Sequence, residues 1–228
     1  MHVDTPPLKR HKIAPELAAS DHRGDVPLNG WIPRWNLTTS HRKGLLDKSR
    51  LDDAIINAMQ DLIAEKYASQ GWQPVAMGKI GYDFAPAPSV QILHNGSNHW
   101  LASASTSQGI YVADSLLTEP NSATKQQLLC LYRSPLSVAN YIDVTYIPVQ
   151  KQRGRIHCGD FAVAFAAAFA SRQSPSTISN LRFDQDIMRR HLFTCLKDQS
   201  LTEMPPSLLS FPVTLPKQVT YRIYQTGD

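Results

Sequence analysis

Residues 150–171 decide the fold, and they read QKQRGRIHCGDFAVAFAAAFAS. The first eight residues are polar and contain Gly154, which is typical of a flexible loop. From Cys158 onward almost every residue is Phe, Ala or Val, and small apolar side chains on every face are typical of a helix that is packed tightly on all sides. The stretch therefore predicts a loop that runs directly into a buried central helix, with Cys158 in its first turn.

Cys158 lies where a thiol becomes acidic. The first backbone N–H groups of a helix have no partner within the helix, and the helix dipole is positive at that end. Both effects favour the thiolate, and the pKa of a cysteine falls from ~8.5 to ~3.5–7.5 in such settings, above all beside a protonated histidine. Gly159 removes a side chain next to the sulfur, which we expect to let a substrate carbonyl approach. By position alone, a small core residue is an equally good interpretation of Cys158.

Upstream of the loop, the pattern indicates a helix followed by several strands. Apolar residues recur every three or four positions from Leu51 to Ile63, which predicts a helix from residue 50 to about residue 68 with Ser49 as its N-cap. Strands are predicted at 89–94, 99–105, 109–115 and 142–149, and further helices at 121–132 and 183–197. The order predicts an α+β fold, with a central mixed β-sheet flanked by helices and a possible nucleophile at the N-terminus of a buried central helix.

The composition suits one folded domain with tails. Apolar residues make up 42% and charged residues 18% of the 228 residues, so a substantial core can form. Residues 1–29 mix Pro, His and basic residues without periodicity, which predicts a flexible tail. We expect the folded domain at 30–200 and a C-terminal extension at 201–228.

Cysteine usage and apolar run lengths bear on the compartment and the partners. Three cysteines are few, and because their number is odd they cannot all pair, so they do not indicate a disulfide framework. Free thiols favour a reducing compartment, the nucleus or the cytoplasm. The longest apolar run, 161–170, is far short of the roughly 20 residues that span a bilayer, and the N-terminus does not resemble a secretory signal. We therefore expect no membrane partner.

The net charge of +4 is modest. The basic cluster at 9–12 is compatible with a nuclear import signal or a weak contact to a polyanion, although a solvated tail is the simpler interpretation. No base-reading module is visible, so the sequence argues against a nucleic-acid partner.

Three polar residues elsewhere can join Cys158 in one site. His99 begins a predicted strand and Asp114 ends the next one, so adjacent strands would bring them together at one end of the sheet. Asp114 would then hold the imidazole in one tautomer and stabilise its charged form. Gln152 and the backbone N–H of Cys158 would form a two-donor oxyanion hole. Each residue alone is better explained as a structural one, but the ordered set is far more specific.

The same segments resemble a known family. Residues 152–159 (QRGRIHCG) resemble the Gln-x-x-Gly-x-Asp-Cys-Gly box of the ubiquitin-like-protein proteases, the clan that includes the SUMO proteases and the adenovirus protease. Residues 90–93 (VQIL) with 98–100 (NHW) resemble the family's His-Trp strand. Residues 112–116 (VADSL) resemble its Tyr-Asp-Ser-Leu strand, and residues 50–57 (RLDDAIIN) resemble its Trp-Leu-Asn-Asp helix. The resemblance spans about 45–200. Residues 183–185 and 188–192 resemble the compact, mobile-element-associated members of invertebrates.

The resemblance implies a cysteine peptidase domain at 30–200 that cleaves after glycine at the C-terminus of a ubiquitin-like protein. The implied reaction is precursor processing or deconjugation, including deSUMOylation, by a monomer without cofactor or metal. The implied catalytic residues are Cys158, His99, Asp114 and Gln152, and the implied substrate contacts are Trp100, Arg50, Asp53 and Gly159. The pair His191 and Cys195 falls short of a metal site, and we interpret Cys130 and Cys195 as packing residues.

Two positions depart from the family pattern. His157 stands where the family has Asp, which changes the hydrogen bonds of the loop. Arg50 stands where the family has the Trp that covers the tunnel for the Gly-Gly tail, whereas Trp100 keeps one wall of that tunnel. These departures leave open a protease domain that acts only as a binding module. A nucleic-acid-associated protein and an acetyltransferase with the same catalytic residues are further alternatives.

Overall fold

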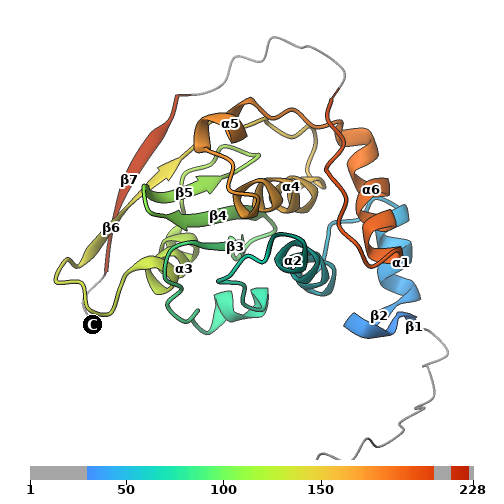
Figure 1. The fold of residues 1–228 in the computed structure, drawn as a ribbon, viewed down its shortest axis with the longest axis horizontal. Helices are drawn as coiled ribbons and strands as arrows, with labels where there is room; N and C mark the ends of the chain where they lie inside the picture. The colour runs from blue at the N-terminus through green and yellow to red at the C-terminus, as the bar shows by residue number, and fades with distance from the viewer. Residues whose placement is uncertain (1–29, 208–216, 226–228) are drawn as a thin grey trace, which may run out of the picture.

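The computed structural model describes residues 30–207 and 217–225, which form an α+β fold around a five-stranded sheet (Figure 1). The strands lie in the order β3 (Ser89–His94), β4 (Trp100–Thr106), β5 (Gly109–Ala113), β6 (Tyr141–Tyr146) and β7 (Val219–Tyr224). Strands β5 and β6 are parallel and the other neighbours are antiparallel. The predicted α+β class with a mixed central sheet is confirmed.

Helices cover both faces of the sheet. The main ones are α2 (Asp53–Tyr67), α3 (Ser122–Tyr132), α4 (Cys158–Ala170) and α6 (Gln185–Lys197). Because side chains alternate along a strand, Ile92 and Ala102 pack into the core that holds α2, α4 and α6, whereas Leu93 and Leu101 pack into the core that holds α3. Every residue of α4 is buried, so the prediction of a central buried helix is confirmed.

The sequence does not predict several short elements. These are β1 (Gly30–Ile32), the 3-10 helix η1 (Pro33–Trp35), β2 (Leu37–Thr38), α1 (Thr39–Leu46), the 3-10 helix η2 (Val75–Lys79) and α5 (Pro175–Asn180). They bury few side chains, so their apolar periodicity is weak; α1, for example, buries only Leu45.

The C-terminal part of the chain adds a strand to the sheet. Within the extension predicted at 201–228, β7 pairs antiparallel with β6 along its whole length and forms one edge of the sheet. Only Ile223 of β7 is buried, so the strand depends on the ladder that β6 supplies rather than on an apolar face of its own. The tail predicted at 1–29 lies outside the described residues.

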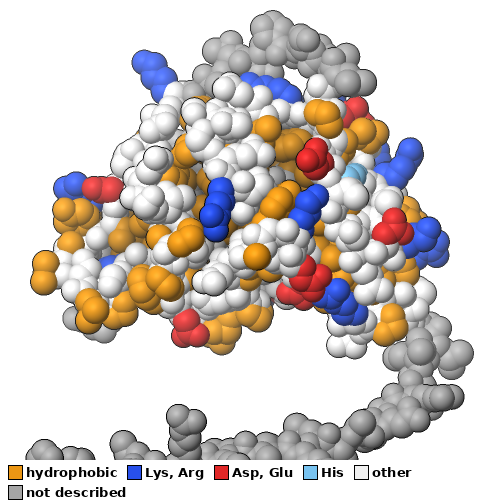
Figure 2. All heavy atoms as spheres, in the orientation of Figure 1, with side chains coloured by type: hydrophobic (Ala, Val, Ile, Leu, Met, Phe, Trp, Pro, Cys, Tyr) orange, Lys and Arg blue, Asp and Glu red, His pale blue; other side chains and the backbone are white. Residues whose placement is uncertain are grey.

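The surface gives two simple observations. On the face shown in Figure 2, positive and negative side chains are scattered among polar and apolar ones and do not gather into one charged patch. Within the described residues, no helix has the length and apolar character needed to cross a bilayer.

Helix α2 begins later than its periodicity predicts. The predicted N-cap, Ser49, is wrong: the cap is Asp52, whose side chain accepts a hydrogen bond of 3.0 Å from the backbone N–H of Ile55. Tertiary partners hold the preceding carbonyl groups, because Arg189 donates to the oxygen of Ser49 and the indole of Trp100 donates to that of Leu51. These carbonyls are therefore not available to extend the helix toward its N-terminus.

Asp52→Ala is expected to lower the free energy of unfolding by about 1 kcal/mol, because the N–H of Ile55 loses its acceptor. Urea unfolding measured by circular dichroism will test this expectation. Ser49→Ala is the matched control and should unfold like the wild type, since within the described residues Ser49 forms hydrogen bonds only through its backbone N–H and oxygen. Equal losses in the two variants would contradict the assignment of the cap.

Candidate active site

The fold brings the predicted site residues together from three elements. His99 directly precedes β4, and Asp114 directly follows β5. Since β4 and β5 are antiparallel, with Ala102 opposite Ala113, the start of one strand lies beside the end of the other. Cys158 opens helix α4, so its thiol lies at the positive end of that helix.

Asp114 orients the imidazole of His99. Its Oδ1 lies 2.6 Å from Nε2 of His99, and both side chains are almost fully buried. The carboxylate also accepts the N–H of Leu116 at 2.8 Å, the N–H of Thr118 at 3.1 Å and the hydroxyl of Thr118 at 2.7 Å. Thr118 was not predicted as part of the site, although a hydroxyl residue four positions after an Asp at a strand end is compatible with a turn around that carboxylate. These bonds hold the carboxylate of Asp114 at the Nε2 edge of the ring.

Nδ1 of His99 is the nitrogen left for chemistry. Asp114 forms its hydrogen bond with Nε2. The other ring nitrogen, Nδ1, is buried and has no hydrogen-bond partner among the described residues. The Cys158 thiol is close enough to this ring that each group shifts the pKa of the other, although the contact falls short of full hydrogen-bond geometry. The thiol, whose sulfur lies 3.9 Å from the backbone oxygen of Asn98, has to turn toward Nδ1 before this nitrogen can take its proton.

The pKa values favour a thiolate beside an imidazolium. Burial lowers the pKa of His99, but the hydrogen bond to Asp114 and the Cys158 thiol outweigh burial and raise that pKa to about 9. Burial raises the pKa of Cys158, but His99 and the backbone N–H groups of Trp100 and Gly159 bring it below its ordinary value. Burial likewise raises the pKa of Asp114, and the contacts with His99 and with Thr118 lower it overall. Both shifts favour the thiolate–imidazolium form of the pair over the neutral form.

Gln152 is buried in the loop before Cys158, residues 150–157, which is called the cysteine loop below. Its Oε1 accepts the hydroxyl of Ser115 at 2.7 Å, and its Nε2 donates to the oxygen of Gly154 at 3.0 Å. One N–H of the amide is thereby used inside the loop, so a role in an oxyanion hole rests on the second N–H. The sequence analysis missed Ser115, which directly follows Asp114 and ties the end of β5 to the cysteine loop.

Trp100 is the first residue of β4, and Arg50 lies in the segment before α2. Trp100 donates from Nε1 to the oxygen of Leu51 at 2.9 Å and contacts the ring of His94. Arg50 is exposed and donates from Nε to the oxygen of Arg155 at 3.2 Å. The substituted position therefore links the segment before α2 to the loop before α4.

Asp53 and Gly159 occupy the first turns of α2 and α4. Asp53 is exposed at the N-terminus of α2, where its charge suits the helix dipole. The reason predicted for Gly159 needs correction. A Cβ at Gly159 would lie 2.9 Å from Cβ and Cδ1 of Leu51, so the glycine allows close packing of α4 against the segment before α2. The space beside it is filled by protein rather than kept open for a substrate.

A buried charge network that the sequence analysis missed supports the cysteine loop. Asp160 forms two bonds with Arg189, at 2.7 Å and 3.0 Å, and its Oδ2 also lies 2.8 Å from Nδ1 of His157. Arg189 further donates to the oxygen atoms of Ser49 and Ile156. His157, which departs from the family pattern, is thus held by Asp160.

The remaining cysteines lie elsewhere. Cys195 is buried in α6, with its sulfur 3.4 Å from Nε2 of His191 and 3.6 Å from the hydroxyl of Thr202. Cys130 is partly buried on α3 against the second core. Across 30–207 and 217–225, no three His, Cys, Asp or Glu residues converge as metal ligands.

Alkylation of Cys158 by iodoacetamide is expected to persist well below the pH at which an ordinary thiol reacts. Asp114→Asn removes the charge that sustains the raised pKa of His99, so less imidazolium faces the thiol and the pKa of Cys158 rises. The variant should therefore shift the alkylation profile to higher pH. Peptide mass spectrometry that follows Cys158 and Cys195 separately gives the rates, and identical Cys158 profiles in wild type and variant would contradict the pairing.

The fold is similar to that of solved protease structures, although the sequence alone finds no match. No family model and no curated protein matches the sequence. Among solved structures, the chain is similar to the SUMO protease Ulp1 with its catalytic cysteine oxidised to a sulfonic acid, at a TM-score of 0.55 and 12% identity over 75% of this chain and 88% of that chain.

Two further structures agree with this match. The C-terminal Ulp1 protease domain in complex with Smt3, the yeast ortholog of SUMO, has a TM-score of 0.51 and 12% identity over 71% of this chain and 83% of that chain. A de-sumoylating protease has a TM-score of 0.50 and 16% identity over 71% of this chain and 85% of that chain. The predicted resemblance to SUMO proteases is confirmed at the level of the fold.

Proposed function

We propose that this chain is a cysteine peptidase that cleaves after glycine at the C-terminus of a ubiquitin-like protein, in a precursor or in a conjugate. The observation that carries the proposal is the buried Nδ1 of His99 near Cys158, which has no hydrogen-bond partner among the described residues while Asp114 holds Nε2. A buried polar atom without a partner is costly. A general base for a thiol needs one ring nitrogen free to accept the proton and the other held by a carboxylate. His99 has this arrangement next to a thiol at a helix N-terminus.

In the proposed reaction, Nδ1 of His99 takes the proton of Cys158, and the thiolate attacks the carbonyl of the substrate glycine. The second N–H of Gln152 and the backbone N–H of Cys158 stabilise the oxyanion. The C–N bond then breaks as the imidazolium protonates the departing amine. A water molecule gives its proton to His99 and attacks the thioester, the C–S bond breaks, and the thiolate is regenerated together with the free glycine carboxylate.

Burial of the site supports a narrow substrate. Cys158 is only 2% exposed and His99 only 4%. A side chain beside the scissile bond would need space that such burial does not leave, whereas glycine has no side chain. An extended chain that ends in glycine, as in a ubiquitin-like protein, is therefore the substrate that fits best. Because the thiolate is prone to oxidation, we also propose that the protein works in the nucleus or the cytoplasm, where thiols stay reduced.

Ubiquitin-like proteins that carry a C-terminal electrophile will test the proposal. A panel that includes SUMO and ubiquitin is incubated with the full chain, and adducts are detected by intact mass. At least one probe should add its mass to the wild type and none to Cys158→Ser. A folded wild type that reacts with no member of the panel, or a variant that labels as fast as the wild type, would overturn the assignment.

A second candidate is a binding module that has kept the fold without turnover. It is favoured by the incomplete contact between His99 and Cys158 and by the exposed Arg50 in place of the tunnel Trp. Binding and labelling measurements together distinguish the two candidate functions. Saturable binding of a ubiquitin-like protein in calorimetry, with no adduct from the matching electrophile, would select the binding module.

A further inference from the structure

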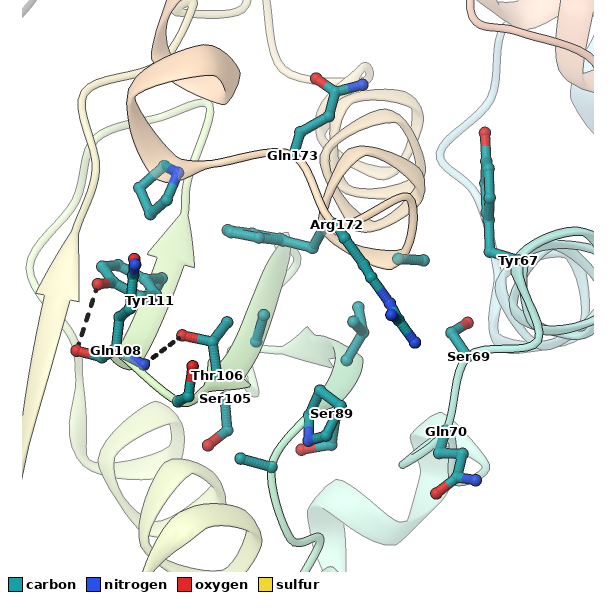
Figure 3. A pocket seen from close by; sticks show the side chains of 18 of the residues that line it. Tyr67, Ser69, Gln70, Ser89, Ser105, Thr106, Gln108, Tyr111, Arg172 and Gln173 are labelled. Carbon is teal, nitrogen blue, oxygen red and sulfur yellow. Dashed lines mark hydrogen bonds between the residues drawn. The ribbon is translucent and has the colours of Figure 1, made fainter.

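A cavity lies at the end of α4 opposite Cys158. Its volume is about 640 Å³, and it is walled by the end of α2, the start of β3, the end of β4 and the segment that follows α4 (Figure 3). Twelve helical rises separate Cys158 from Ala170, which at 1.5 Å per residue amounts to about 18 Å. The cavity is therefore distinct from the candidate active site.

The size and the lining suit a small organic molecule. Small-molecule sites usually enclose about 300–1,000 Å³ and combine an apolar lining with a few polar groups. Here Val90, Ala104 and Phe169 supply apolar surface, while Ser105 and Gln108 supply hydroxyl and amide groups. This mixture fits a ligand with a flat apolar body and a polar end.

Arg172 determines the charge of that polar end. It is the sole charged residue among those that line the cavity, and its side chain points into the cavity (Figure 3). Within the described part of the chain, its guanidinium forms no hydrogen bond and no ion pair, and no Asp or Glu lines the cavity to neutralise it. A guanidinium without a protein partner is suited to carboxylate, sulfonate or phosphate groups, which it binds with two parallel hydrogen bonds.

The backbone conformation at Arg172 does not require an arginine side chain. The N–H of Arg172 donates to the oxygen of Phe169, and the N–H of Gln173 donates to that of Ala168, which is the usual termination of a helix by a left-handed residue. Arg172 has a φ of 61°, a conformation that glycine adopts without steric cost. A large cationic side chain therefore stands where glycine would be the more stable choice.

We propose that this cavity is a binding site for a small organic anion, in which Arg172 holds the acidic group and the wall around Phe169 holds a flat apolar body. The site is separate from the proposed peptidase chemistry, and binding there can be measured without any turnover.

The probe pair 8-anilinonaphthalene-1-sulfonate and N-phenyl-1-naphthylamine isolates the role of the charge, because the two dyes differ only by the sulfonate. In fluorescence titrations of the full chain, the sulfonate dye is expected to bind one site at least about tenfold more tightly than the neutral dye, as expected for a charge-assisted contact. Equal affinities for the two dyes would overturn the proposal.

Arg172→Gly is the decisive variant. It should weaken the sulfonate dye to the level of the neutral dye while the melting temperature stays the same or rises, so loss of binding cannot be attributed to unfolding. Arg172→Lys should keep most of the preference for the anion. Arg190→Gln, which removes an exposed charge on α6, is the matched control and should leave both affinities unchanged. An undiminished preference in Arg172→Gly would refute the site.

The position of the dye is tested by filling the cavity. Ser105→Trp places a large ring within the lining and should exclude both dyes. If both dyes bind this variant as they bind the wild type, the dye site lies elsewhere and the proposal fails.

Discussion

His99→Ala is expected to slow the reaction of Cys158 with a matching ubiquitin-like probe by roughly 10²–10⁴-fold, the range typical for loss of a general base. The variant removes an imidazole that lowers the pKa of the Cys158 thiol, so the thiolate fraction falls. It also removes the group that would protonate the departing amine. Stopped reactions followed by intact mass will give the rate constants.

The control uses the second cysteine–histidine contact of the chain. His191 is partly buried and lies 3.4 Å from the sulfur of Cys195, yet it belongs to α6 and not to the candidate site. His191→Ala should therefore leave the rate of probe labelling unchanged. A loss in His99→Ala of less than about tenfold, with both variants folded, would show that Cys158 does not depend on this ring.

Asp160→Asn is expected to lower the free energy of unfolding by about 3–5 kcal/mol, because it leaves a buried arginine without its counter-charge. Asp160 is fully buried, and Arg189 is only 3% exposed. The variant keeps the shape of the side chain, so the loss reports the charge rather than a cavity. It also weakens the anchor through which Arg189 holds Ser49 and Ile156 on either side of the site.

Asp186→Asn provides the comparison for this ion pair. Asp186 pairs with Arg153 at 2.9 Å, but both side chains are more than half exposed. Exposed pairs contribute about 0–1 kcal/mol, so this variant should unfold close to the wild type. Urea unfolding of both variants decides the matter, and a small loss in Asp160→Asn would mean that water or rearrangement compensates Arg189.

Local pattern was sufficient for much of the fold. The run of Phe, Ala and Val after Cys158 is apolar on every side, and such a segment can only be buried, so the position of α4 could be predicted. Strand β3 at 89–94 was predicted with its observed bounds, since an Asn-Gly turn follows it directly. Helices α1 and α5 and strand β7 lack such signals, because most of their side chains face solvent.

Some residues of the candidate site could likewise be predicted from the sequence, and others could not. The order of His99, Asp114, Gln152 and Cys158 could be read from motifs, and the structure brings His99 to both Asp114 and Cys158. The groups that support them could not be predicted. Thr118 on Asp114, Ser115 on Gln152 and the Asp160–Arg189 pair are common residue types, and their importance depends on which partner the folded chain brings to them.

The sequence by itself determined the fold class, the central helix and the chemical types that gather at its first turn, because periodicity, turn residues and a short motif act over a few neighbouring positions. Only the tertiary structure decided that Asp52 rather than Ser49 caps α2, that Gly159 is required by Leu51, and that an arginine without a partner among the described residues lies in a cavity at the far end of α4. These outcomes depend on contacts between residues far apart in the chain, and no local pattern records the distance between two such residues once the chain has folded.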